Sequence, residues 1–542
     1  MREIKNLLPV ADIFAGPGGL GEGFAQAGFE ILLSAEVDPV ACQTLKLRKF
    51  FHQFTKRDVP EAYYKFIRGE IGIEILKEKY PEEWLNAANA VANVELGTRD
   101  GNSVFNRMLD QKLEDKEDFI LIGGPPCQAY SLAGRSRRLG VGNRTLENEH
   151  ETKNDLIARL ANEFYKDRRH TLYLEYTKIL CRYQPAVFVM ENVKGMGSAK
   201  AGSEEGHGTV FDNICFGLRN PFTAMEIRTK EGEIPKGYKL YSLTNETSRL
   251  FTQSEIQTAN ECVIRSEHYG VPQARHRIII LGVREDLDFV PETLLPSLKH
   301  ATVRQTIDRL PKLRSGLSKE PDSFVAWKNA ISDQVKGKLI GHTNVDSEIT
   351  STLDRLESAT LLSGRGAPFL FDTNNDFLCD EPVLQTLIND PRINGVIQHE
   401  TRSHIRADLL RYFLVSILGK INGKSPKFSE WKGKLGSLKP NHSNVTLDNR
   451  KLKSSSHNDR FKVQVWDKPA STIVSHIAKD GHYFIHPDTT QCRSFTVREA
   501  ARLQTFPDNY FFCGTRTQQY HQVGNAVPIL LAKQIAKLLV SC

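Results

Sequence analysis

Short apolar runs alternate with helix-like segments along the first half of the chain. Each run is rich in Ile, Val, Leu or Phe, and the runs predict five strands, at residues 9–14, 30–35, 119–122, 186–190 and 277–283. Between them, apolar positions recur with helical spacing, as at residues 171–182. Because strands that alternate with helices form parallel sheets covered on both faces, this pattern predicts an α/β fold. The loops after the strands would then lie where such sheets bind ligands.

Two stretches interrupt this alternation. Residues 51–117 are longer than a simple crossover and read as mostly helical and polar, which predicts an insertion. Residues 286–465 lack the alternation altogether. Two helices are predicted near the end of the chain: an amphipathic helix at 495–507 that Pro507 stops, and a helix with a strong apolar face at 527–540.

These patterns predict two domains. We expect an α/β domain over residues 1–285, completed by residues 495–542, and a second domain of mixed structure over residues 286–494. The chain has 542 residues, of which 25% are charged and 40% hydrophobic. That length and composition can support more than one packed core, and they exclude a disordered or fibrous protein.

Cysteine usage and apolar runs indicate the cellular setting. The nine cysteines are scattered and include no Cys-x-x-Cys pair, which argues against a zinc ribbon, a redox dithiol or a disulfide framework. The amino terminus lacks the long apolar stretch of a signal peptide, and no run approaches the roughly 20 residues of a membrane span. We expect a cytoplasmic protein with no membrane partner and no metal.

A glycine-rich loop, residues 14–21, connects the first predicted strand to a helix. Glycines let the backbone approach a ligand at a helix amino terminus. Glu36 follows the second strand, where an acidic side chain commonly binds a ribose diol. The pair is compatible with a nucleoside-containing cofactor, and equally with a tight turn and an ordinary surface glutamate.

The loop Gly123-Gly124-Pro125-Pro126-Cys127-Gln128 follows another apolar strand directly. Two prolines stiffen the loop, and the glycines leave room beside it. Cys127 would therefore sit at the sheet edge, where a lowered thiol pKa would make it a nucleophile. The other eight cysteines are interpreted as buried and inert.

Two further strands carry polar side chains at their ends. Glu191 follows the strand at 186–190 and could act as an acid or as a hydrogen-bond partner of a polar ring. Arg275 and Arg277 enter the strand at 277–283 and would share one face of an extended segment. Two guanidinium groups can hold a carboxylate, a phosphate or a base carbonyl, although each of these residues alone could be an ordinary surface charge.

In combination these motifs resemble those of the DNA cytosine-5 methyltransferases. DIFAGPGGLGEGF and AEVDP are similar to the first two motifs of that family, and GGPPCQAYSLAGR is similar to its nucleophile motif. DRRHTLYLEY, MENVKGM, VPQARHRIIILGV, RSFTVREAARLQTFPDNY and QYHQVGNAVPILLAKQIA resemble the later motifs, in the family's order. The resemblance covers residues 12–283 and 493–536 and implies a Rossmann-like methyltransferase fold.

The resemblance also implies roles for the residues singled out above. Cys127 would add to C6 of cytosine so that C5 can attack a methyl group, and Glu191 would hold N3 and the exocyclic amine. Arg277 would bind the ring carbonyl, and Arg275 would order the loop or touch a phosphate. The base that removes the C5 proton is left open.

The implied cofactor is S-adenosylmethionine. By resemblance its pocket comprises Phe14, Gly16, Gly18, Gly19, Leu20, Glu36, Pro126, Leu172, Asn525 and Val527. The family's short third motif, an acid that meets the adenine amine, has no clean match here. Asp58, Glu95 and Asp100 are the candidates within the expanded stretch 51–117.

The implied substrate is double-stranded DNA. The target base must be flipped out of the duplex, and the loop 128–150, which contains glycines and arginines, is predicted to close over DNA. In the family the region corresponding to 286–494 reads the sequence. Between residues 402 and 462 there are 14 Lys and Arg but four acids, whereas the whole chain carries a net charge of +7. This basic stretch is expected to contact phosphates, the alternative being a solvated basic surface.

The sequence thus predicts a DNA cytosine-5 methyltransferase, monomeric on DNA, with a role in restriction–modification or phage defence. A separately encoded restriction or defence protein would be a partner by the same resemblance. One alternative is a transfer-RNA cytosine-5 methyltransferase, against which the size of region 286–494 argues. Another is a catalytically silent DNA-binding protein, which the presence of Cys127, Glu191 and Arg277 disfavours.

Overall fold

The computed structural model describes most of the chain. The described residues are 7–55, 58–116, 118–126, 172–198, 210–227, 236–244, 258–341, 345–358, 364–372, 379–431, 438–440, 460–540 and 542. Cys127, the loop 128–150 and several of the basic residues between 432 and 459 lie outside them. No helix within these ranges is long and apolar enough to cross a membrane.

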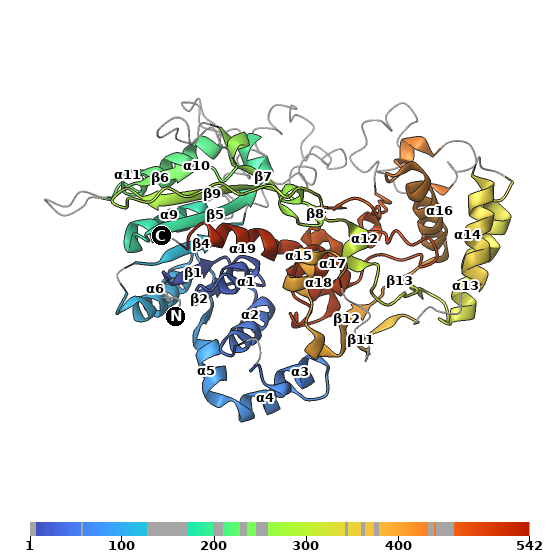
Figure 1. Cartoon of the computed structure of the whole chain (residues 1–542), viewed down its shortest axis with the longest axis horizontal. Helices are drawn as coiled ribbons and strands as arrows, with labels where there is room; N and C mark the ends of the chain where they lie inside the picture. Colours follow the sequence, from blue (N-terminus) through green and yellow to red (C-terminus); the bar gives the residue numbers. More distant parts are fainter. Residues whose placement is uncertain are drawn as a thin grey trace, which may run out of the picture.

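A central sheet of eight strands organises the first part of the molecule (Figure 1). Its order is β3-β2-β1-β4-β5-β9-β6, with β7 paired to β9. The strands are β1 Val10–Ile13, β2 Ile31–Glu36, β3 Val91–Asn93, β4 Ile120–Gly123, β5 Val187–Val193, β6 Tyr238–Tyr241, β7 Val263–Arg265 and β9 His276–Arg284. This arrangement confirms the α/β prediction and the Rossmann-like fold.

The sheet is mixed, and in this respect the expectation of a parallel sheet was wrong. The first five strands in this order pair in parallel, but β9 pairs antiparallel with β5, β6 and β7. The apolar run of β9 does not distinguish the two directions, because Ile278 to Leu281 are fully buried in either case. The antiparallel pairing lengthens β5 to Val193, so Glu191 lies within the strand and not after it.

Helices cover both faces of the sheet. On one face, α1 (Gly19–Gln26) and α19 (Ile529–Lys537) share an apolar cluster with β1 and β4. On the other face, α6 (Arg99–Leu113), α9 (Leu172–Tyr183) and α10 (Val210–Arg219) share a second cluster. The helix α2 (Pro39–His52) runs beside α1, and the short α11 (Pro221–Ala224) follows α10.

The expanded stretch 51–117 divides into two parts. Its first part forms three short helices, α3 (Glu61–Ile67), α4 (Ile73–Lys79) and α5 (Pro81–Asn89), which pack on α2 around an aromatic cluster. Its second part returns to the sheet as β3 and α6. The predicted insertion is therefore helical, but it ends near residue 89.

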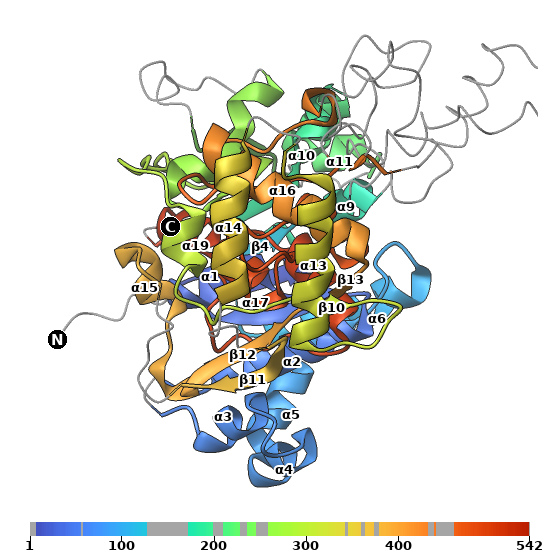
Figure 2. The same ribbon diagram turned by 90° about the vertical axis from the view of Figure 1, so that its right-hand side faces the viewer.

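The region after β9 contains a core of its own. The helices α13 (Phe324–Lys338), α14 (Asp346–Ser358) and α16 (Arg406–Asn422) pack around Trp327 and Phe413. Figure 2 shows α13 and α14 in front of α16, with a two-stranded ribbon of β11 (Gly366–Phe371) and β12 (Gly395–Glu400) below them. The remaining elements are short: α12 (Val303–Ile307), α15 (Pro382–Ile388), β10 (Gly316–Leu317), β13 (Ser403–His404), β14 (Ala470–Ser471) and β8 (Gln273–Ala274).

The apolar clusters do not divide at residue 285. Leu310, Leu384 and Ile473 belong to the same cluster as the sheet residues of β1, β4 and β9. Parts of region 286–494 thus complete the core of the α/β domain, whereas α13, α14 and α16 form a separate one.

The predicted amphipathic helix at 495–507 is shorter and more buried than its pattern indicates. It forms α17 (Val497–Leu503), and every residue of it is buried, including three charged ones. Arg498 donates to the carbonyls of Ile397, Pro507 and Tyr510, and Arg502 pairs with Asp508 at 2.8 Å. The prediction that the polar side of this helix faces solvent is therefore wrong. Its charged side chains form hydrogen bonds with loops of the protein and not with water. The next helix, α18 (Arg516–Asn525), follows this loop.

The crossing of α1 and α19 provides a test of the packing. A Cβ on Gly23 would stand 2.4 Å from Cβ of Ala532 and 2.6 Å from the backbone nitrogen of Lys533. Alanine normally stabilises a helix over glycine by about 1 kcal/mol, but this clash should cost about 1–3 kcal/mol. Gly217 in α10 is a matched control, since its added Cβ would meet nothing nearer than 3.7 Å. We expect urea denaturation to show that Gly23→Ala destabilises and Gly217→Ala stabilises; equal effects would contradict this packing.

Candidate active site

The ends of β1, β2, β4 and β5 lie at one edge of the sheet because these strands are in register. Ile13 of β1 pairs with Ala35 of β2 and with Gly123 of β4, and Gly123 pairs with Met190 of β5. The loops that follow these strands therefore start side by side.

The glycine-rich loop and Glu36 are joined directly. The backbone N–H of Gly16 donates to Oε2 of Glu36 at 2.8 Å, and the N–H of Asp38 donates to Oε1 at 2.9 Å. Burial raises the pKa of the Glu36 carboxyl. Gly16 and Gly18 both have positive φ, and a Cβ on Gly16 would meet no atom within 4 Å. The loop thus leaves open space beside a half-buried carboxylate.

The carboxyl-terminal segment packs against the same loop. A Cβ on Gly19 would stand 2.4 Å from the carbonyl oxygen of Val527, and the hydroxyl of Tyr510 donates to the carbonyl of Pro17. Phe14 has a positive φ of 54° where β1 ends, and Leu20 is buried. The structure therefore brings together the predicted cofactor residues of the loop with Glu36 and Val527.

The other predicted cofactor residues lie around this edge. Leu172 begins α9, and its Cδ2 would be 3.2 Å from a Cβ on Gly97, in the segment after β3. Pro126 ends the described part of the loop after β4. Asn525 ends α18, with its amide nitrogen 3.3 Å from Nδ1 of His521.

Three carboxylates were candidates for the missing third motif. Asp58 accepts from the hydroxyl of Thr55 ahead of α3, within the helical insertion. Glu95 is exposed and comes two residues after β3, whose last residue, Asn93, pairs with Glu36. Asp100 lies in the first turn of α6. Only Glu95 belongs to a loop that directly follows a strand at the site edge.

Glu191 and Arg277 form an ion pair across β5 and β9. Nε of Arg277 lies 2.8 Å from Oε1 of Glu191, and each side chain is 14% exposed. The pairing of Val193 with Arg277 sets this position. A Cβ on Gly124 would stand 2.9 Å from Oε2 of Glu191. The loop that leads to Cys127 therefore runs along the carboxylate of Glu191.

Arg275 lies in the interior, as the one residue between β8 and β9. Only 3% exposed, it donates to the carbonyls of Ile473 at 2.7 Å and Gly524 at 3.3 Å. Burial, and then Arg277, lower its pKa. These two contacts support the role of ordering the chain that the resemblance implies for Arg275.

Gln273 and Asp12 are two site residues that the sequence reasoning missed. Gln273 donates to Oε1 of Gln504 at 3.1 Å and accepts from the N–H of Ile473 at 2.7 Å, so it fastens the same segments as Arg275. Its position within the motif VPQARHR, next to Arg275, could have indicated that Gln273 lies near the site. Asp12 is buried beneath the glycine-rich loop, and a Cβ on Gly21 would stand 2.8 Å from its Oδ2.

The basic stretch 402–462 is less free than its charge count suggests. Three of its described cations pair with carboxylates from outside it: Arg406 with Glu320 at 2.7 Å, Lys420 with Glu348 at 2.8 Å and Arg460 with Asp480 at 3.3 Å. The fold thus neutralises part of the excess that the sequence count assigned to this stretch.

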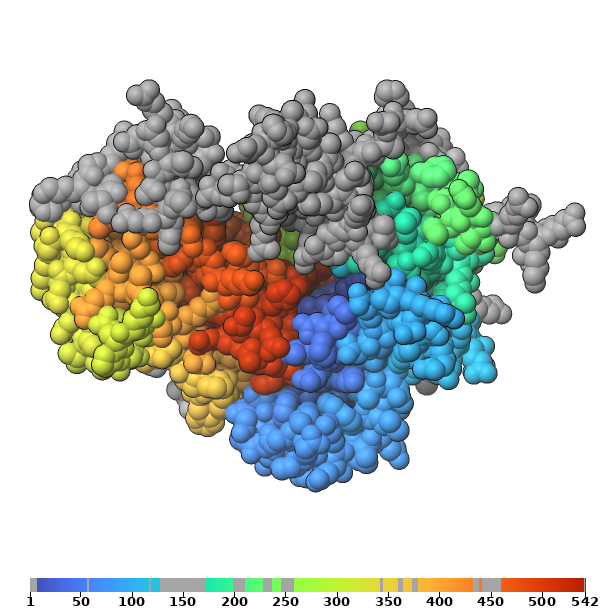
Figure 3. Space-filling view, turned by 180° about the vertical axis from the view of Figure 1, so that it is seen from behind, coloured from blue at the N-terminus to red at the C-terminus, as the bar shows by residue number. Residues whose placement is uncertain are grey.

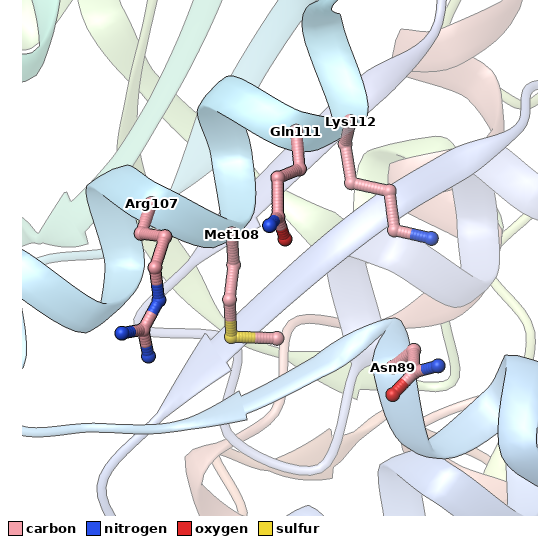
Figure 4. A pocket seen from close by; sticks show the side chains of 5 residues that line it. All are labelled: Asn89, Arg107, Met108, Gln111 and Lys112. Atoms are coloured by element: carbon pink, nitrogen blue, oxygen red, sulfur yellow. The ribbon is translucent and has the colours of Figure 1, made fainter.

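A shallow pocket lies away from these residues. It is lined by residues of α5 and α6, namely Asn89, Arg107, Met108, Gln111 and Lys112 (Figure 4). None of the predicted site residues contributes to it. Among the described residues there is also no group of three His, Cys, Asp or Glu side chains that could hold a metal ion.

The fold and this strand-edge site define a Rossmann-like methyltransferase. A sequence profile described as C-5 cytosine-specific DNA methylase matches residues 8–76, 157–218 and 258–541. The chain belongs to that family and is a DNA cytosine-5 methyltransferase.

Two type II methyltransferases among the relatives agree with this assignment. The chain is 29% identical to the type II methyltransferase M.Bpa9945I of Bacillus paralicheniformis, over 97% of both chains. It is 23% identical to the type II methyltransferase M.AgeI of Thalassovita gelatinovora, over 97% of this chain and 98% of the other. The solved structure of the S. pombe Dnmt2 methyltransferase is 12% identical with a TM-score of 0.38, over 98% of each chain.

Asp12 predicts a pH dependence of stability. Burial raises its pKa from 3.8 to about 7. Between these values the folded chain keeps a proton that the unfolded chain has lost, so rising pH disfavours folding at this residue. We expect Asp12→Asn to gain stability relative to the parent as the pH rises from 4 to 7, measured by urea denaturation at several pH values. Parallel pH curves for variant and parent would contradict the buried carboxyl.

Proposed function

We propose that the chain transfers a methyl group from S-adenosylmethionine to C5 of cytosine in a specific double-stranded DNA sequence. The observation that supports this most is the Glu191–Arg277 pair beside the loop that leads to Cys127. The pair offers a carboxylate and a guanidinium to one polar ring, and the nucleophile is three residues from Gly124.

The chemistry follows from the needs of cytosine. The thiolate of Cys127 adds to C6, which makes C5 an enamine carbon able to take up the methyl group. Glu191 holds N3 and the exocyclic amine as negative charge builds on the ring, and Arg277 binds the ring carbonyl. A base then removes the C5 proton, the C5–C6 double bond re-forms and the thiolate leaves.

The residues present fit the cofactor. The open space beside Gly16 borders the Glu36 carboxylate, which can accept from the ribose hydroxyls. The pocket is completed by Phe14, Gly18, Gly19, Leu20, Pro126, Leu172, Asn525 and Val527. We add Glu95 as the acid for the adenine amine, because its loop alone follows a strand at this edge. When bound, S-adenosylmethionine supplies the methyl group as an electrophile.

The DNA is held from two sides. Extrusion of the base from the duplex brings C6 within reach of Cys127, and we assign closure over the DNA to the loop 128–150. Region 286–494, with its separate helical core, reads the sequence. The chain acts as a monomer on DNA, and the type II names of its relatives support a separately encoded nuclease as partner.

The covalent step can be tested with 5-fluorocytosine. Fluorine at C5 cannot leave as a proton does, so the Cys127–C6 bond should persist after methyl transfer. We expect duplex DNA of mixed sequence containing 5-fluorocytosine, with S-adenosylmethionine, to yield an adduct stable in denaturing gels. The Cys127→Ala variant should form no adduct, and its rate of methylation should fall by at least about 10³-fold. Its affinity for the cofactor should stay the same. An adduct formed by Cys127→Ala, or adducts on tRNA alone, would refute the proposal.

The salt dependence of DNA binding tests the recognition region. Replacement of Lys451 and Lys453 by Gln should make the slope of log K against log salt less steep by about 0.9 for each phosphate that is no longer neutralised. Arg406→Gln is the control, because its charge is already paired with Glu320. We expect the control to leave the slope unchanged. An unchanged slope in the double lysine variant would show that this stretch does not bind phosphates.

A further inference from the structure

Asn509 connects three separate parts of the chain. It lies in the loop between α17 and α18 and is only 6% exposed. Its Oδ1 accepts from Arg48 of α2 at 2.9 Å, and its Nδ2 donates to Oδ2 of Asp390 at 2.6 Å. Its backbone carbonyl accepts from the hydroxyl of Tyr63 of α3 at 2.8 Å. Both ends of the Asn509 amide are therefore committed, in opposite directions.

One direction leads to the glycine-rich loop, residues 14–21, which is called the cofactor loop below. Arg48 donates twice to Glu22, at 2.7 and 2.6 Å, and Glu22 stands in the first turn of α1. The N–H of Glu22 donates to the carbonyl of Gly18, in the loop itself. The neighbour of Asn509, Tyr510, donates to Pro17. Tyr510 thus contacts the glycine-rich loop directly, and Asn509 is connected to it through Arg48 and Glu22.

The other direction leads into region 286–494. Asp390 lies between α15 and β12, and its Oδ2 also accepts from the hydroxyl of Tyr64 at 2.8 Å. Its Oδ1 accepts from the N–H of Arg392, whose guanidinium lies 4.4 Å from the Tyr64 ring. Beside them Ile393 and Ile397 pack into the aromatic cluster of α2 to α5. Figure 3 shows the carboxyl-terminal segment, in red, between the blue and the yellow-orange parts that it connects.

Burial makes these contacts act as one unit. Glu22 and Arg48 are 3% and 6% exposed, and Arg48 lies 4.0 Å from the centre of the Phe51 ring. A buried ion that loses its partner is strongly destabilising. If α1 shifts, Arg48, Asn509 and Asp390 therefore have to shift with it, because otherwise one of their buried hydrogen bonds is lost.

We infer that Asn509 is a positioning residue that couples the cofactor loop to region 286–494, so that cofactor and DNA each strengthen the binding of the other. The inference rests on the proposed function, because it takes the loop as the cofactor site and region 286–494 as the DNA-reading part. Coupling of this kind is reciprocal and commonly amounts to at least about five-fold in affinity.

A reciprocal exchange tests the network. Asn509→Asp places a carboxylate against the carboxylate of Asp390. The double variant Asn509→Asp with Asp390→Asn again sets an amide donor against a carboxylate acceptor, and it has the same net charge as the parent. We would measure the Kd for a duplex that carries the sequence methylated by the parent protein, with and without S-adenosylhomocysteine. Calorimetry would give the Kd for S-adenosylhomocysteine, with and without the duplex.

The expected result is a change in coupling. In the parent, S-adenosylhomocysteine should tighten DNA binding by at least about five-fold; in Asn509→Asp this ratio should fall to within about two-fold of unity, and the double variant should recover it. A merely structural residue would weaken both affinities and leave the ratio intact. A parent ratio near one, or a ratio unchanged by the single substitution, would overturn the inference. A parent that binds neither ligand would instead refute the proposed function.

A milder pair of variants serves if Asn509→Asp does not fold. Tyr64→Phe removes one hydroxyl from Asp390 and keeps the ring in the cluster. Tyr80→Phe removes a hydroxyl from the same cluster that has no hydrogen-bond partner among the described residues. We expect the first variant to lower the coupling ratio at least about two-fold and the second to leave it at the parent value. Equal ratios in the two variants would overturn the inference.

Discussion

The antiparallel pairing of β5 with β9 is the constraint on which the site depends. It extends β5 beyond its apolar run, so that Val193 faces Arg277 and Glu191, two residues earlier in β5, reaches Arg277 diagonally. A parallel neighbour would have its amino-terminal end at the opposite edge of the sheet, and the two side chains would not meet. The reversal of one strand therefore creates the polar pair beside the cysteine loop.

The carboxyl-terminal segment completes what the sheet begins. Val527 packs on Gly19, Tyr510 reaches Pro17, and Arg275 holds Gly524 and Ile473 together. The charges of α17 are buried because they serve these loops and do not face solvent. Region 286–494 is inserted between β9 and this segment. Because β9 ends where Val283 pairs with Val187, at the edge of the sheet opposite the site, the carboxyl-terminal end of the region returns to the site and its amino-terminal end does not.

Much of this organisation was accessible from the sequence, and the exceptions have physical causes. The strands and the glycine-rich loop were predicted because apolar runs and glycines have local meaning, although β5 ends at Val193 and not at residue 190. The direction of β9 was not, because a fully buried strand such as Ile278–Leu281 reads the same in either direction. Arg275, Gln273 and Asn509 depend on partners hundreds of residues away, and local pattern carries no information on such contacts.

The charge of the recognition region shows the same limit in electrostatic form. A count along the chain treats Lys420 and Arg406 as free cations, but Glu348 and Glu320 come from earlier helices and loops to meet them. Paired cations add little to the field that attracts a phosphate backbone, whereas unpaired ones determine how steeply binding falls with salt. Net charge in a sequence window is therefore an upper bound on what DNA meets. The fold decides how much of that charge supports the protein itself and how much remains for the substrate.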